Sequence, residues 1–196
     1  MTGTLAATFW PSHRTASSSL SAATRNVILV IAGACLITLG AKIQVPFWPV
    51  PLTLQILAVS VIAAAYGLRL GLLTVALYLG AGAMGLPVFA GALAGPAALI
   101  GPTAGFLAGF LVMAAIIGAA ADRGLDRSFA SLIGIMAIAN VIVFIPGLLW
   151  LGTWTGYGAK LLETGFSPFI VGTAVKTLLG AAIMPAAWAI LNRLRG

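Results

Sequence analysis

The sequence predicts an all-α polytopic membrane protein with six transmembrane helices and cytoplasmic N- and C-termini. Three observations carry this prediction: 61% of the 196 residues are hydrophobic, only 7% are charged, and the mean hydropathy is +1.14. In soluble domains about 25% of residues are charged, so we expect most of the surface of this protein to contact lipid rather than water. Because each spanning helix needs ~20 apolar residues, a chain of this length holds roughly six spans and no separate soluble catalytic domain.

The N-terminal segment, residues 1–25, is expected to be a flexible cytoplasmic tail, followed by a single six-helix membrane domain at residues 26–196. The tail has neither the apolar core nor the small-residue cleavage site of a signal peptide. It holds His13, the only histidine, which has no second metal ligand nearby in the sequence. We therefore expect no function for this histidine.

The first three apolar runs are separated by a proline-rich loop and a glycine-bounded turn. Residues 27–41 form the first run, which stops at Lys42, and the prolines within 46–51 prevent a continuous helix. The second run, residues 53–66, leads through the short turn into a third run that reaches residue 83. A turn this short predicts that the second and third helices are antiparallel neighbours.

The segment after the third run, residues 88–101, is rich in Gly, Ala and Pro and almost free of polar side chains. Its composition is too broken for a helix, and an irregular backbone exposed to lipid would leave its polar groups unpaired. We therefore expect this segment to lie over or within protein, as a lid or plug.

The C-terminal half contains three further apolar runs. The fourth run, residues 103–121, ends in the polar stretch 122–127, and the fifth run covers residues 128–151. A loop rich in glycine and aromatic residues, 152–167, precedes the sixth run at 168–194. Together the six runs account for the predicted spans.

Basic residues set the expected orientation, because Lys and Arg are retained on the cytoplasmic side. With the N-terminus inside, only Lys42 and Lys160 fall outside. The cytoplasmic set is Arg14, Arg25, Arg69, Arg123, Arg127, Arg193 and Arg195. The net charge of +7 reflects the presence of only three acids rather than a basic patch, so it indicates membrane topology and no nucleic-acid partner.

The remaining basic residue, Lys176, lies about ten residues into the sixth run, which is ~15 Å along a helix. A lysine at the centre of a membrane helix costs ~2.5–3.5 kcal/mol on insertion scales and is a functional hypothesis by default. Snorkelling to the membrane surface is the alternative, which this depth disfavours. No acid lies within any run, so the counter-charge is either a backbone carbonyl or an anionic ligand.

Other polar residues fall in the same outer half of the predicted helices. They are Asn140, Gln55, Tyr78, Thr103 and Thr173. The asparagine has an alternative role, because an Asn in a membrane helix can bond two helices together for ~0.6 kcal/mol on average. Convergence of such groups under loops that carry Trp48 and Phe89 predicts an outward-facing pocket for a small molecule that is partly polar and partly apolar.

Motifs for catalysis are absent from the sequence. It contains no G-x-x-x-x-G-K-[ST] phosphate loop, no H-E-x-x-H and no clustered aspartates. Cys35, the only cysteine, lies within the first apolar run and has no partner. We therefore predict a protein that is not an enzyme, with no catalytic residue, no metal site and no cofactor.

Several loop segments resemble a known family. The stretch Ala-Lys-Ile-Gln-Val-Pro-Phe-Trp-Pro-Val-Pro-Leu-Thr-Leu-Gln at 41–55 is similar to the hallmark of the biotin-specific BioY family. Matching segments follow in the same order at Tyr78-Leu79, 85–91, 101–106 and Ala139-Asn140. Each segment is weak alone, but the set is specific and covers most of the chain between Lys42 and Lys176.

The resemblance implies the substrate-capture (S) component of an energy-coupling-factor transporter in the bacterial cytoplasmic membrane. Such a protein binds biotin on the extracytoplasmic side, in a pocket capped by the loops after the first and third helices. A separate transmembrane scaffold and two ATPase subunits are its implied partners, besides the lipid bilayer. These partners would explain the missing phosphate loop.

The resemblance also implies a ligand-binding set. By position, Lys176 and Asn140 match family residues near the ligand, and the valerate carboxylate of biotin is the anion expected at the lysine. Thr173 stands where family members often have an acid, and its hydroxyl can bond the ureido group. The full candidate set is Lys176, Asn140, Thr173, Gln55, Tyr78, Thr103, Phe106, Phe89 and Trp48.

Three alternatives remain open at this point. One is a capture protein of the same architecture for another vitamin, such as thiamin. A second is a membrane enzyme acting on a lipid or isoprenoid, against which the lack of paired acids argues. A third is a purely structural subunit, in which Lys176 would be replaceable by leucine.

Overall fold

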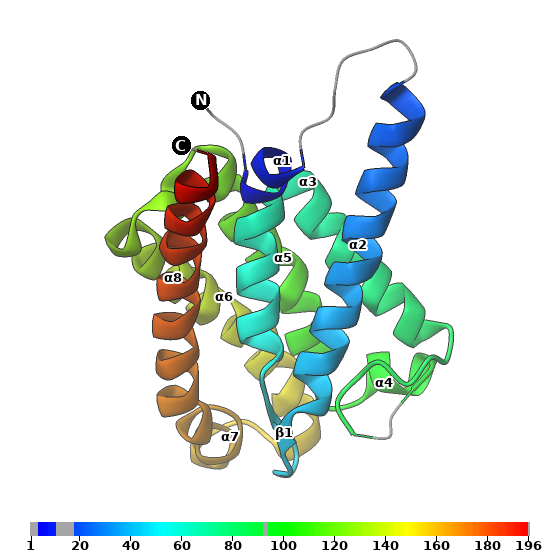
Figure 1. The fold of residues 1–196 in the computed structure, drawn as a ribbon. Helices are drawn as coiled ribbons and strands as arrows, with labels where there is room; N and C mark the ends of the chain where they lie inside the picture. The colour runs from blue at the N-terminus through cyan, green and yellow to red at the C-terminus, as the bar shows by residue number, and fades with distance from the viewer. Residues whose placement is uncertain (1–3, 11–17, 92–93, 196) are drawn as a thin grey trace.

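The computed structural model describes residues 4–10, 18–91 and 94–195, and it is predominantly helical (Figure 1). His13 and Arg14 lie outside the described residues. The elements, in chain order, are α1 (Leu5–Phe9), α2 (Ser18–Lys42), β1 (Gln44–Val45), β2 (Leu52–Thr53), α3 (Gln55–Ala83), α4 (Pro96–Ile100), α5 (Ala104–Asp122), η1 (Leu125–Arg127), α6 (Phe129–Thr155), α7 (Ala159–Gly165) and α8 (Ser167–Arg195).

Five helices in the described part of the chain are long and apolar enough to cross a membrane. The helical class is therefore confirmed, while the count of six stays a prediction. The second and third expected spans fall together in α3, which is interrupted at Gly67 by a non-helical backbone with φ 78° and ψ −175°. This positive φ suits glycine, which has no Cβ to clash. Figure 1 shows the chain doubling back there, so that α3 has two arms.

Close helix contacts depend on glycines of α5, the helix in which the largest share of the apolar window, 67%, is buried. A Cβ added at Gly118 would lie 2.7 Å from the carbonyl carbon of Gly67, at the fold in α3. A Cβ at Gly109 would lie 3.1 Å from the carbonyl oxygen of Val143 in α6. Small residues let membrane helices approach to this distance, so α5 forms the centre of the bundle between α3 and α6.

The described part of the N-terminal segment contains α1 and the start of α2. Helix α1 is capped by Thr4, whose Oγ1 accepts a hydrogen bond of 3.4 Å from the backbone N–H of Ala7. Arg25 donates from Nη1 to the carbonyl oxygen of Trp10 at 2.6 Å. Helix α2 begins at Ser18, whereas the first apolar run begins at residue 27. A short capped helix and the first turns of α2 therefore lie within residues 1–25.

Two other loops contain short helices that composition did not predict. In the apolar segment 88–101, expected to be too broken for a helix, Gly95 has a φ of 74° and Pro96 opens α4. Proline fits there because its fixed φ is already helical. Its lack of an N–H costs nothing, since an N–H in the first turn has no partner within the helix. The loop expected at 152–167 contains α7. In Figure 1, β1, α4 and α7 lie at one end of the bundle, and both termini lie at the other.

Candidate functional site

A cavity of about 650 Å³ opens at the end of the bundle that carries β1, α4 and α7. Its volume lies within the range of ~300–1,000 Å³ that is typical of small-molecule sites. The walls come from the loop between α2 and α3, the first turn of α3, the loop between α3 and α4, α4 with the loop after it, and the first turns of α5. One residue of α6 and two residues of α8 complete the lining. Segments far apart in the chain therefore share one site.

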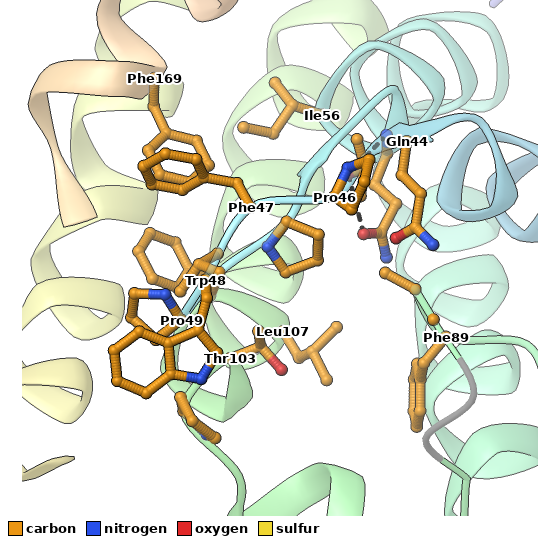
Figure 2. Close-up of a pocket in the computed structure, with 18 of the residues that line it drawn as sticks. Gln44, Pro46, Phe47, Trp48, Pro49, Ile56, Phe89, Thr103, Leu107 and Phe169 are labelled. Carbon is orange, nitrogen blue, oxygen red and sulfur yellow. Dashed lines mark hydrogen bonds between the residues drawn. The ribbon is translucent and has the colours of Figure 1, made fainter. Parts of the chain in front are cut away.

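Most of the cavity wall is apolar, with aromatic rings packed on each other. The ring of Phe106 in α5 lies edge-on to Phe144 of α6 at 5.8 Å and nearly parallel to Phe169 of α8 at 6.4 Å. In the view of Figure 2, the loop carrying Pro46 to Pro49 crosses the cavity, with Phe169 on one side and Phe89 on the other. Such a wall suits flat or aliphatic parts of a ligand.

Lys176 supplies the charge of this cavity. Its side chain is only 7% exposed, and its Nζ donates a hydrogen bond of 2.9 Å to the main-chain carbonyl of Thr53. Among the described residues that line the cavity, it is the one charged side chain. An ammonium group has three donors, so a single carbonyl leaves it able to bind an anion.

A second polar group in the wall is the carboxamide of Gln55, whose orientation is set by two neighbours. Its Nε2 donates to the hydroxyl of Tyr78 at 2.6 Å, and its Oε1 accepts from Oγ1 of Thr53 at 2.9 Å. Gln55 lines the cavity, whereas Tyr78 is fully buried behind it. The glutamine keeps one N–H and one lone pair for a ligand.

Asn140 and Thr173 lie behind the cavity wall, between α6 and α8. The Nδ2 of Asn140 donates to Oγ1 of Thr177 at 2.8 Å, and that hydroxyl donates to the carbonyl of Thr173 at 2.8 Å. Neither Asn140 nor Thr173 is among the lining residues. The Oδ1 of Asn140 and the Oγ1 of Thr173 are buried without a hydrogen-bond partner. Each can therefore still form a hydrogen bond next to the turn that carries Lys176.

The structure thus divides the candidate set in two. Six members line the cavity: Lys176, Gln55, Thr103, Phe106, Phe89 and Trp48. Tyr78, Asn140 and Thr173 stand behind it.

Sequence reasoning missed other lining residues. Phe169 and Phe144 complete the aromatic wall, and Gln44 lines the cavity with an Oε1 that is buried without a partner. A signal for Phe169 was present, since it lies two helical turns before Lys176 on the same face. For Gln44 the signal was its place in the loop segment 41–55.

The fold and the cavity define a multi-pass membrane protein that holds a small molecule at one end of its helix bundle. A family model described as the BioY family matches residues 12–193, and the chain belongs to that family.

Curated relatives agree with this assignment. The chain is 38% identical over 148 residues to "Biotin transporter BioY" of Thermotoga maritima, covering 76% of this chain and 86% of the relative. It is 36% identical over 159 residues to "Probable biotin transporter BioY" of Pyrococcus horikoshii, covering 81% and 93%. The fold is similar to the crystal structure of the S-component for biotin from an ECF-type ABC transporter, with a TM-score of 0.70, 24% identity, and coverage of 93% of this chain and 95% of that chain.

Proposed function

We propose that the protein captures biotin in this cavity and serves as the substrate-binding component of an energy-coupling-factor transporter, which imports the vitamin across a bacterial cytoplasmic membrane. The observation that carries the proposal is the buried ammonium of Lys176 in an aromatic cavity whose described lining residues include no acid. Biotin combines an anionic tail with a compact bicyclic ring, which are the two features that this cavity accommodates. Relatives named as biotin transporters support the same ligand.

The valerate carboxylate binds Lys176, because a carboxylate accepts a stronger, charge-assisted hydrogen bond than a neutral carbonyl does. The carboxamide of Gln55 offers a donor and an acceptor, which match the N–H and carbonyl groups of the ureido ring. Phe106 and Phe89 pack against the apolar parts of the ligand, and Trp48, 78% exposed, stands at the mouth.

Three further members of the set act close to these contacts. Thr103 lines the cavity at the start of α5 and offers a hydroxyl to the ligand. Asn140 and Thr173 act from behind the cavity wall, where their unpartnered oxygens help to orient the turn of α8 that carries Lys176. This role needs no direct contact with biotin.

We further propose six spans, with both termini in the cytoplasm and the cavity open to the outside. The two arms of α3 on either side of Gly67 count as separate crossings. The termini lie together in Figure 1, opposite β1 and α7. Lys42 and Lys160 lie at the cavity end, while Arg25 and Arg193 lie near the termini, as the retention of positive charge in the cytoplasm requires.

The energising partners are a transmembrane scaffold and two ATPase subunits. The sequence carries no phosphate loop, so ATP hydrolysis has to come from another chain. The fold similarity to an S-component supports the assignment of substrate binding and ATP hydrolysis to separate subunits.

Equilibrium binding of tritiated biotin to the purified full chain in detergent tests the proposal. We expect saturable binding that is weakened about 10- to 150-fold in Lys176→Ala and unchanged in Lys160→Ala, which removes an exposed lysine outside the cavity lining. Thiamin should not compete, because its cationic ring would meet the ammonium of Lys176. No binding at micromolar biotin, or competition by thiamin, would contradict the proposal. Metal-dependent turnover of a lipid by the isolated chain would favour an enzyme instead.

A further inference from the structure

Lys42, at the C-terminal end of α2, reaches across to the loop between α3 and α4. Its Nζ donates to the main-chain carbonyl of Phe89 at 2.8 Å and to that of Gly91 at 3.1 Å. The side chain is exposed and is not among the residues that line the cavity. Its position also suits the helix dipole, because a cation in the last turn of a helix is stabilised. One ammonium group therefore ties the end of α2 to two main-chain carbonyls of a loop that forms part of the cavity wall.

The loop segment that Lys42 holds carries an anchor into the bundle. Phe89 is 3% exposed, and its ring occupies the space left by the missing side chain of Gly82. A Cβ at Gly82 would overlap several ring atoms, the third nearest of which lies 2.8 Å away. The Gly82 carbonyl also accepts a hydrogen bond of 2.8 Å from the N–H of Gly95, at the far end of the same loop. Phe89 and Gly95, at two points of the loop, thus both contact Gly82 in the last turns of α3.

Phe89 in turn packs against Tyr78, which is hydrogen-bonded to Gln55 in the cavity wall. Its ring lies edge-on to Tyr78, with centroids 5.4 Å apart and an interplanar angle of 88°. Tyr78 is fully buried, and its hydroxyl accepts the 2.6 Å hydrogen bond from Nε2 of Gln55. A continuous series of contacts therefore joins the Lys42 ammonium to a carboxamide that lines the cavity.

We propose that Lys42 is a positioning residue for the ligand-binding site. It seats Phe89 on Tyr78, and Tyr78 in turn fixes the carboxamide of Gln55. Lys42 therefore sets the affinity for the ligand without touching it. This inference rests on the proposed function, since it concerns the same cavity and the same vitamin.

A substitution at Gly82 tests the contact between Phe89 and Tyr78 independently of Lys42. Gly82→Ala leaves Lys42 in place and pushes the Phe89 ring off Tyr78. Gly80→Ala is its matched control, because a Cβ at Gly80 meets nothing within 4 Å on the same last turns of α3. Lys160→Met is the matched control for Lys42→Met, since both remove an exposed lysine outside the cavity lining.

The experiment is a saturation titration of each purified full-length variant with tritiated biotin, which gives the dissociation constant and the number of binding sites separately. Loss of the hydrogen bonds from a charged donor should raise Kd about tenfold or more in Lys42→Met and in Gly82→Ala. The number of sites should stay unchanged. Lys42→Arg keeps the charge and the paired donors, so it should restore Kd to within about threefold of the wild type. Both controls should bind as the wild type does.

Several outcomes would overturn the inference. A merely structural role of Lys42 would lower the number of sites, or the melting temperature without ligand, at unchanged Kd. Loss of the folded protein in Lys42→Met together with unchanged affinity in Gly82→Ala would assign Lys42 to folding alone. No binding by the wild-type protein would overturn the proposed function and this inference with it, whereas wild-type binding with unaffected Lys42→Met and Gly82→Ala overturns this inference only.

Discussion

The Nζ of Lys176 in α8 lies 2.9 Å from the main-chain oxygen of Thr53, at the end of β2. This hydrogen bond ties the last helix to the loop that crosses the cavity. It uses one of the three donors of the ammonium, so two remain for a ligand carboxylate.

The charge of the ligand tail should decide its affinity. Biotin methyl ester, which lacks the carboxylate, should bind about 10- to 150-fold more weakly than biotin, because a hydrogen bond to a charged group is worth ~1.5–3 kcal/mol. Competition against tritiated biotin measures this ratio. In Lys176→Met the two ligands should compete equally, and a ratio that survives in this variant would contradict the assignment of the carboxylate to Lys176.

Trp48 should report the arrival of the ligand at the mouth of the cavity. Its side chain is 78% exposed, and a ligand that covers it would shift its fluorescence to shorter wavelength. We expect this biotin-dependent shift in the wild-type protein and in Trp10→Phe, which changes an exposed tryptophan directly after α1. Helix α1 lies at the end of the bundle opposite β1, α4 and α7 (Figure 1). The shift should disappear in Trp48→Phe. A full shift in that variant would show that Trp48 does not meet the ligand.

The close approach of α5 to the fold in α3 should be sensitive to one methyl group. Gly118→Ala places a Cβ 2.7 Å from backbone atoms of Gly67 and Leu68, which cannot move aside as a flexible side chain does. Overpacking of this kind costs ~1–3 kcal/mol, so the melting temperature in detergent should fall. Gly134→Ala is the control, since nothing lies within 4 Å of its added Cβ. Equal melting temperatures for the two variants would contradict the packing described for α5.

Asp126 should make stability depend on pH. This carboxyl group is fully buried in η1, accepts a hydrogen bond of 2.6 Å from Nε1 of Trp188, and leaves Oδ1 without a partner. Burial raises its pKa above 3.8, although the bond from Trp188 and the charge of Arg127 oppose the shift and Asp122 adds to it. The folded state then binds the proton more tightly than the unfolded state, so stability falls as pH rises from about 3.8 through the raised value.

Thermal unfolding between pH 4 and 8 checks this pH dependence. Asp126→Asn cannot ionise, so it should remove the part of the slope that is due to this group. Glu163→Gln is the control, because Glu163 is exposed and is not among the groups that shift the pKa of Asp126. A slope that is unchanged in Asp126→Asn would assign the pH dependence to other groups.

Orientation in the membrane should be visible by cysteine labelling. In a Cys35→Ser background, cysteines placed at the exposed positions Lys160 and Arg123 should react from opposite sides. An impermeant maleimide added to intact cells should label Lys160→Cys only, and Arg123→Cys should react after the membrane is opened. The reverse pattern would place the cavity on the cytoplasmic side.

The sequence predicted those features whose free energy depends mainly on the type of each residue and on its neighbours along the chain. Long apolar runs predict membrane helices because transfer into lipid is favourable residue by residue, and Lys176 stood out because a charge in such a run is costly. The proline-rich segment 41–55 indicated the family before any contact was known. Helix ends depend on caps and tertiary contacts as well as on apolar runs, as the start of α2 at Ser18 and the presence of α7 illustrate.

The partners of these residues were decided by the tertiary structure alone. Lys176 meets the carbonyl of Thr53, and Asn140 faces Thr177 rather than the cavity, because the rotation of each helix is set by how closely its neighbours pack. That packing depends on glycines such as Gly118, whose contribution comes from the atoms opposite them and not from their own chemistry. The sequence alone thus determined a membrane protein of the BioY type with one charge inside. Only the fold decided which groups surround that charge.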